Sequence, residues 1–167
     1  QSPIDDKVGR ERADLARTAA REGDLPGLRA LLDLDPRLIN ANLLPVAIKA
    51  DKPEAVRFLL DRGASINATV PERWNGWLPQ PPLVQAAATG NADMVKLLLD
   101  RGAKPNIQSE GTPLTAAVRH GDTALVTLLL NRCADVTKGG PLFIAAQTAN
   151  TELAQLLIAR GAAVNPP

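Results

Sequence analysis

Short apolar runs recur along the chain, and each is followed by the same kind of polar ending. Residues 58–64 read Phe-Leu-Leu-Asp-Arg-Gly-Ala, and this order returns with few changes at 97–103, 128–134 and 156–162, with a degenerate first copy at 30–33. Three of these endings carry Gly63, Gly102 or Gly161, the residue type that most easily takes the left-handed conformation at a helix end. The pattern predicts a recurring short helix that brings its Leu-rich triplet into a core.

A second pattern precedes each apolar triplet at a fixed distance, beginning at positions 14, 42, 81, 112 and 140, so the spacings are 28, 39, 31 and 28. It predicts another helix, because it combines residue types suited to a helix start: Asp14, Asn42 and Thr112 as N-caps, and Pro82, Pro113 and Pro141 at the first helical position. Small pairs such as Ala86-Ala87 let neighbouring helices approach closely, and Gly90 or Gly121 then ends the helix. The two patterns together therefore predict that each repeat consists of two short antiparallel helices, called its first and its second helix.

One such repeat cannot bury its own apolar face, so several repeats must stack to form a stable core. The composition agrees with a helical stack, because Ala and Leu are the commonest residue types and the aromatics are few: Phe58, Trp74, Trp77 and Phe143. This mixture argues against a β-sandwich or barrel. With 45% hydrophobic residues the chain can bury a sizeable core, and no apolar run approaches the roughly 18 residues of a membrane span.

On these residues the chain resembles the ankyrin repeat family from about residue 14 to 165. Residues 112–117, Thr-Pro-Leu-Thr-Ala-Ala, are close to the family's T-P-L-H-x-A, and residues 97–106 follow its L-L-L-x-x-G-A-x-x-N ending. The family's His after T-P-L is missing from all five copies, where the position holds Arg17, Pro45, Val84, Thr115 and Phe143. The spacings of 28 and 31 are shorter than the family's usual value of about 33, so we expect two or three hairpins to be clipped to tight turns.

The resemblance implies an all-α fold, an α-solenoid of five helix-turn-helix ankyrin repeats joined by short hairpins or turns. We expect repeats at 14–41, 42–68, 81–111, 112–139 and 140–167, the last with a C-terminal tail, an N-terminal extension or cap at 1–13, and an inserted loop at 69–80. Ser2-Pro3 is a good helix start, so the extension is expected to form a short helix or a helical extension that covers the exposed side of the first repeat.

The resemblance also implies protein binding through hairpin tips and the exposed end of each first helix. Mapped onto this chain, the end positions that we select are Arg21, Lys49, Thr89, Arg119, His120 and Gln147. With Glu22 the only anion in the row, the surface should be mildly positive and should suit a partner with an acidic patch. The alternative is that these residues are simply solvated helix ends.

The spacing of 39 exceeds the shortest spacings by 39 − 28 = 11 positions, and both Trp residues lie in this extra stretch. Because Trp and Arg are enriched at interface hot spots, the loop residues selected as partner contacts are Arg73, Trp74, Asn75, Trp77 and Leu78. The alternative is that Trp77 and Leu78 fold back on the repeats as a local core, and one Trp can serve each purpose.

Charge and motifs exclude several function classes. The 19 basic and 18 acidic residues leave a net charge of +1, which gives no case for nucleic-acid binding or membrane insertion. A single Cys and a single His exclude zinc sites built from clusters of these residues. Phosphate-loop, dinucleotide, nucleophile-elbow and zinc-protease motifs are all missing, so we expect no enzyme activity, no metal and no cofactor.

The Ala-, Leu- and Arg-rich composition resembles small free-standing bacterial ankyrin proteins. We therefore expect a module, monomeric when free, that binds and neutralises or regulates one protein, such as an immunity or inhibitor protein against a bacterial toxin or secreted effector. The favoured compartments are the bacterial periplasm and cytoplasm. Two alternatives stay open: an adaptor or chaperone-like protein that stabilises an enzyme in the same compartment, and a self-associating structural scaffold.

Overall fold

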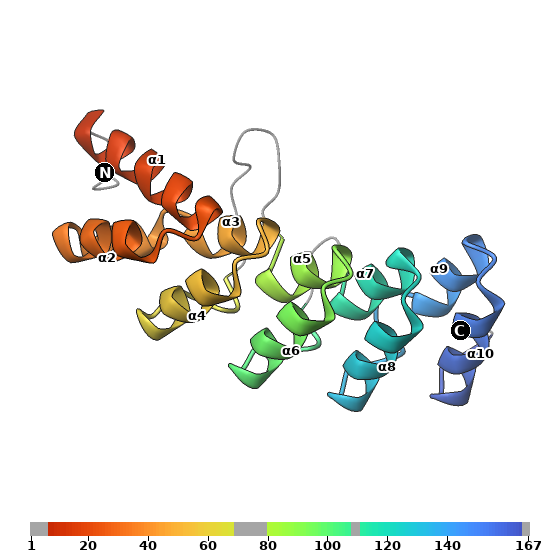
Figure 1. The fold of residues 1–167 in the computed structure, drawn as a ribbon. Coiled ribbons are helices and arrows are strands. Elements are labelled where there is room, and N and C mark those ends of the chain that lie inside the picture. Colours follow the sequence, from red (N-terminus) through yellow and green to blue (C-terminus); the bar gives the residue numbers. More distant parts are fainter. Residues whose placement is uncertain (1–6, 69–79, 108–110, 165–167) are drawn as a thin grey trace. The chain divides into compact units, whose positions relative to one another are not determined.

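The computed structural model describes residues 7–68, 80–107 and 111–164 (Figure 1). These residues form ten α-helices and one 3₁₀ helix, and none of them forms a strand, so the all-α prediction is confirmed. In chain order the elements are α1 (Lys7–Glu22), α2 (Leu25–Leu34), η1 (Pro36–Asn40), α3 (Leu43–Lys49), α4 (Pro53–Asp61), α5 (Pro82–Ala88), α6 (Ala92–Asp100), α7 (Pro113–His120), α8 (Thr123–Asn131), α9 (Pro141–Gln147) and α10 (Thr151–Ala159).

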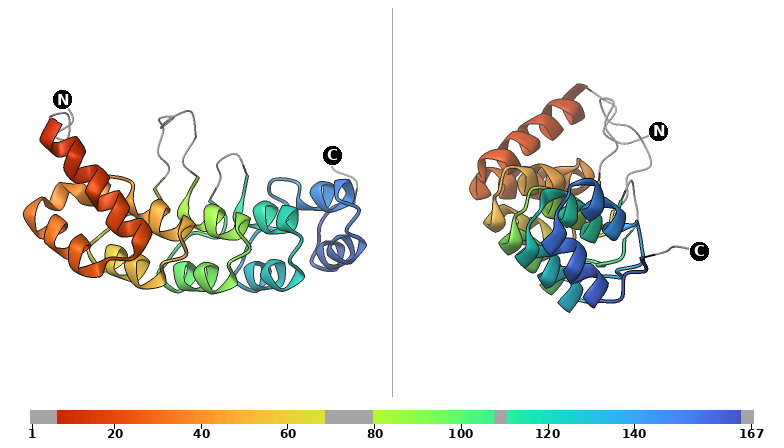
Figure 2. Two further views of the ribbon diagram at one scale, coloured as in Figure 1. Left: turned by 45° about the horizontal axis from the view of Figure 1, so that its top comes forward. Right: turned by 90° about the vertical axis from the view of Figure 1, so that its right-hand side faces the viewer.

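The chain divides into two compact units, Gln1–Ile66 and Asn67–Pro167. The first unit holds the helix pairs α1/α2 and α3/α4, and α1 packs on α3 while α2 packs on α4. The second unit holds the pairs α5/α6, α7/α8 and α9/α10. Within this unit, the first helices α5, α7 and α9 form one layer and the second helices form another (Figure 2). Each unit is therefore a stack of helix pairs.

The N-terminal ends of the helices follow the prediction in part. Pro82, Pro113 and Pro141 each occupy the first position of their helix. Thr112 caps α7 through a capping box, in which its Oγ1 accepts from the Thr115 N–H at 3.1 Å and its own N–H donates to Thr115 Oγ1 at 2.8 Å. This reciprocal pair satisfies two N–H groups that the helix itself leaves open.

The N-cap prediction for Asp14 was wrong, whereas Asn42 does occupy the N-cap position of its helix but without a side-chain cap. Asp14 lies inside α1, which runs from Lys7 to Glu22 without a break, and its carboxylate pairs with Arg17 one turn later. Residues 7–13 of the expected extension form the first part of this long helix, so the extension is helical over these residues. Asn42 does precede α3, but its backbone is left-handed, with a φ of 61°, and its side chain makes no capping hydrogen bond.

Only the central residue of each apolar triplet enters the core completely. Leu59, Leu98, Leu129 and Leu157 are each 0% exposed, whereas their neighbours in the triplets are half-buried or, for Ile158, exposed. Successive residues of an α-helix point about 100° apart, so three in a row span too wide an arc to face one core. The expectation that the whole triplet is buried is corrected accordingly.

Two Asn side chains, Asn67 and Asn106, bridge to the backbone of a following repeat within the second unit. The Asn67 amide accepts from the Lys104 N–H at 2.9 Å and donates to the Gly102 carbonyl. The Asn106 amide accepts from the Asp135 N–H at 2.7 Å and donates to the Cys133 carbonyl at 3.0 Å. Each amide thereby satisfies backbone groups that follow a helix of the next repeat.

Ion pairs join consecutive second helices. Arg132, at the end of α8, lies with its Nη1 2.7 Å from Oδ1 of Asp100 at the end of α6. In the first unit, Arg62 at the end of α4 makes the same kind of pair with Asp33 on α2 at 2.9 Å. These pairs are exposed and add little stability, since such pairs contribute about 1 kcal/mol or less.

Equivalent positions of α7 and α9 differ in how far they are exposed. The helices α7 and α9 begin at the equivalent prolines Pro113 and Pro141, so Phe143 corresponds to Thr115 and Ala146 to Val118. Thr115 is 2% exposed, whereas Phe143 is 67% exposed, and Val118 is buried whereas Ala146 is exposed. Within the described residues of this unit, no further helix pair follows α9 and α10 to cover these positions.

Candidate protein-binding surface

The six described site residues that we selected from the sequence all lie at the C-terminal ends of first helices, and all are exposed. The five selected loop residues, Arg73, Trp74, Asn75, Trp77 and Leu78, lie outside the described residues. The choice between a partner-contacting loop and a local core therefore stays as the sequence left it.

In the first unit, Arg21 occupies the last turn of α1 and Lys49 is the last residue of α3. Because α1 and α3 pack side by side, the two helix ends that carry these cations belong to neighbouring helices. Cations at helix C-termini also interact favourably with the helix dipole, so the pair is compatible with local stability as well as with binding.

In the second unit, the helix ends of α5, α7 and α9 carry Thr89, Arg119 with His120, and Gln147. Arg119 is the only fixed charge among them. The Thr89 hydroxyl donates to the Ala86 carbonyl at 2.9 Å, so its hydrogen is already committed to its own helix. Thr89 is therefore a weaker candidate donor for a partner than Arg119 or His120.

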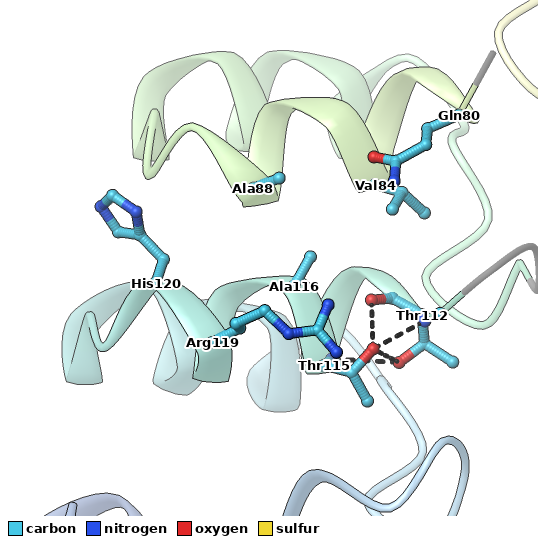
Figure 3. Close-up of a pocket in the computed structure, with 9 residues that line it drawn as sticks. Gln80, Val84, Ala88, Thr112, Thr115, Ala116, Arg119 and His120 are labelled. Carbon is cyan, nitrogen blue, oxygen red and sulfur yellow. Dashed lines mark hydrogen bonds between the residues drawn. The ribbon is translucent and has the colours of Figure 1, made fainter. Parts of the chain in front are cut away.

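A pocket of about 210 Å³ opens between α5 and α7 and brings Arg119 and His120 together with residues that we did not select (Figure 3). Its lining residues come from both helices and from the segments before them: Gln80, Val84, Ala88, Gly111, Thr112, Thr115, Ala116, Arg119 and His120. The side chain of Arg119 points back along α7 toward Thr115, at the edge of the pocket (Figure 3). The pocket thus has a small apolar floor and a cationic edge.

His120 is held at one end of this pocket by its contact with Gly90. A β-carbon built on Gly90 would meet the imidazole, with Nε2 as the nearest atom, so the ring lies directly against the glycine backbone. Gly90 itself has a φ of 71°, which a residue with a side chain adopts only with strain. Sequence reasoning selected His120 but not the glycine that makes room for it.

The pocket's remaining polar groups differ in how far they are already used. The hydroxyls of Thr112 and Thr115 are engaged in the capping box of α7. The sequence signal for that box was the Thr-Pro-Leu-Thr start of the repeat. Gln80 is the one described residue of the expected 69–80 loop, and it lines the pocket, although nothing in the sequence singled it out.

No group of three or more His, Cys, Asp or Glu side chains in residues 7–68, 80–107 and 111–164 lies close enough to hold a metal ion. Across the same ranges, no helix is both long enough and apolar enough to cross a membrane. Cys133 is exposed, with a left-handed φ of 65° at the position where sister repeats carry glycine.

In each unit the helix pairs stack on one another, and Asn side chains bridge repeats of the second unit. This architecture is that of a helical repeat protein. A sequence profile for ankyrin repeats in three copies matches residues 15–109 and again residues 83–167. The chain therefore belongs to the ankyrin repeat family. Ankyrin repeats are in general protein-interaction modules, so the helix ends of each unit, and the pocket of the second unit, are candidate protein-binding sites.

Curated relatives share the repeats within longer chains. The chain is 35% identical over 108 residues to the Ankyrin repeat, SAM and basic leucine zipper domain-containing protein 1 of Nomascus leucogenys, an alignment covering 56% of this chain and 22% of that protein. It is 30% identical over 164 residues to the Ankyrin repeat and KH domain-containing protein mask-1 of Caenorhabditis elegans, covering 89% of this chain and 6% of that protein. The match to each relative thus spans less than a quarter of its length.

Proposed function

We propose that the chain is a non-catalytic binding module that holds one protein partner against the C-terminal ends of its first helices. The observation that carries the proposal is the pocket between α5 and α7, where exposed Arg119 and His120 border an uncharged floor. Together with Arg21 and Lys49 in the first unit, these helix ends favour a partner with an acidic patch. The loop residues 73–78 are proposed as further contacts.

The finer proposal is that binding neutralises the partner, as an immunity or inhibitor protein does against a bacterial toxin or secreted effector. It rests on the composition, which is similar to that of small free-standing bacterial ankyrin proteins. Under this proposal the free protein is a monomer in the bacterial cytoplasm or periplasm.

The first experiment compares capture of the partner by the native chain and by a chain with Arg21→Ala, Lys49→Ala and Arg119→Ala. The matched control carries Arg57→Ala and Lys96→Ala, which remove exposed cations from the second helices α4 and α6. We expect the triple variant to lose the partner and the control to keep it. Equal capture by all three chains would contradict the proposed surface.

Salt dependence tests the acidic patch separately. Exposed charges about 10 Å apart are largely screened at about 0.1 M salt, so affinity for an acidic partner should fall as salt is raised, and less so for the triple variant. Affinity that is independent of salt would remove the charge argument while leaving protein binding intact.

A measurement on the captured partner separates inhibitor from adaptor. An inhibitor abolishes the partner's activity at equimolar ratio, whereas an adaptor or chaperone-like protein leaves activity intact and raises the partner's melting temperature. A self-associating scaffold would instead show a molar mass that rises with the concentration of the chain alone in static light scattering.

A further inference from the structure

We propose that the pocket between α5 and α7 receives a carboxylate side chain, Asp or Glu, from the bound protein. This inference rests on the proposed function and names the chemistry of the group that anchors the partner. Four features of the second unit carry it: the size of the pocket, its charge, the donors that remain open, and the placement of the cation.

The size of the pocket suits one side chain. Its volume of about 210 Å³ is below the roughly 300 Å³ at which pockets for small-molecule ligands begin. The floor is made by short apolar side chains, those of Val84 and Ala88 from α5 and Ala116 from α7. The methylene groups of an acidic side chain can lie on this floor while the carboxylate stays at the polar edge.

The charge of the pocket selects an anion. Arg119 is the only fixed charge among the nine described residues that line the pocket, and none of these nine is acidic. Within the part of the chain that the structure describes, Arg119 forms no ion pair or hydrogen bond. A guanidinium that no described residue engages can offer two parallel N–H groups to a carboxylate, which is the strongest arrangement that Arg makes.

The open hydrogen-bonding groups favour an acceptor. The Thr115 hydroxyl donates to the Thr112 carbonyl at 2.9 Å, and Thr112 Oγ1 accepts from the Thr115 N–H, so the capping box already engages both hydroxyl groups. Gln80 faces these threonines across the pocket and can donate from its amide (Figure 3). A carboxylate can accept hydrogen bonds from both Arg119 and Gln80. A neutral amide pairs less well with Arg119, and the positive charge of an amine is repelled by it.

The position of Arg119 restricts the proposed carboxylate site to the end of α7. The positions that correspond to Arg119 in the flanking helices of the same unit hold Ala88 on α5 and Gln147 on α9. The unit therefore offers one cationic position along its row of helix ends, at the helix that lies between the other two. His120, fixed against Gly90, borders the same position and narrows the direction from which a side chain enters.

The test uses an unbiased peptide library selected on the full chain, followed by synthetic peptides. Each enriched peptide is made with its acidic residue as Glu and as Gln, and both are titrated against the native chain, Arg119→Gln, Arg119→Lys and the control Lys96→Gln. Because Arg119 is exposed and Lys96 is an exposed cation of the same unit, both variants should keep the fold, which thermal melting checks.

The enriched peptides should share an acidic position, and its replacement by Gln should weaken binding to the native chain and to Lys96→Gln about tenfold or more. On Arg119→Gln the two peptides should bind alike, and Arg119→Lys should recover only part of the difference, because Lys lacks the planar fork. A Glu preference that persists undiminished on Arg119→Gln, or enriched peptides without an acidic position, would overturn the carboxylate site. Either result would leave the proposed function standing, which only the capture experiment removes.

Discussion

The imidazole of His120 on α7 lies against the backbone of Gly90, in the space that a β-carbon at position 90 would fill. The contact joins the end of one repeat's first helix to the turn of the preceding repeat within the same unit. It explains why a flexible side chain at a helix end has a defined place at the rim of the pocket.

The replacement Gly90→Ala should displace His120 while destabilising the fold only by the backbone strain. Gly90 has a φ of 71°, and a left-handed conformation costs a residue with a side chain about 1–2 kcal/mol. Gly102→Ala is the matched control, because its φ is 89° and a β-carbon there meets nothing within 4 Å. His120 is the only histidine, so one set of imidazole NMR signals reports its position. Those signals should shift in Gly90→Ala and stay in place in Gly102→Ala; a shift of equal size in both would contradict the contact.

The replacement Leu98→Ala should destabilise the second unit by about 2–5 kcal/mol, because it empties a fully buried position between α6 and its neighbours. Leu97→Ala, one residue earlier in the same triplet, should cost clearly less, since that side chain is only half-buried. Chemical denaturation of both variants measures the difference. Equal losses would mean that the triplet is buried as a whole, as its sequence alone suggested.

Local chemistry explains why much of the fold was predictable from the sequence. Proline fixes the first helical position at Pro82, Pro113 and Pro141, and glycine marks the helix ends, because each residue type constrains its own backbone. The same local reasoning gave a wrong prediction for Asp14. A good capping residue caps a helix only where the helix begins, and α1 begins at Lys7. Asp14 pairs with Arg17 instead.

Features that depend on neighbouring elements were not predictable in this way. Phe143 and Thr115 hold the same position of consecutive repeats, yet one is exposed and the other buried, because only the earlier repeat is followed by another within the described residues. The Arg132–Asp100 pair also needs two helices in register before it exists. Of the site, the row of exposed helix ends was foreseen from the repeat. The pocket was not, since it arises from how α5 packs on α7.

The replacement Asn106→Ala should destabilise the second unit by about 1–3 kcal/mol. It removes two hydrogen bonds, to the Asp135 N–H at 2.7 Å and to the Cys133 carbonyl at 3.0 Å, each contributing about 0.5–1.5 kcal/mol. Asn106→Asp is the informative companion, because it keeps the acceptor and loses the donor, and it should lie between native and Ala. Equilibrium unfolding in urea gives the order of the three proteins. An Asp variant as unstable as Ala would show that the donor carries the bridge.

Asp35 gives the first unit a predictable dependence on pH. The hydrogen bonds that the Arg37 guanidinium donates to its carboxylate, at 2.8 Å to each oxygen, are the main cause that lowers the pKa of Asp35, while burial acts in the opposite direction. Because the folded pKa lies below the unfolded value of about 3.9, the unfolded chain binds more protons in between, so stability rises with pH across that window. The contribution is complete above the unfolded pKa and is lost as pH falls through the folded one.

The melting temperature of Asp35→Asn should therefore fall below that of the native protein increasingly as pH rises through this window, and the difference should be complete above it. Melting temperatures measured from about pH 7 down to about pH 2 should differ most at the upper end and converge at the lower end, where the native carboxyl is also neutral. Asp135→Asn is the matched control in the second unit, since hydrogen bonds from Thr137 are the main cause that lowers the pKa of Asp135. This variant should lose the pH-dependent stability that Asp135 provides and should keep the part that Asp35 provides. A deficit for Asp35→Asn that stays constant at every pH would mean that packing, and not the charge held by Arg37, makes this residue stabilising.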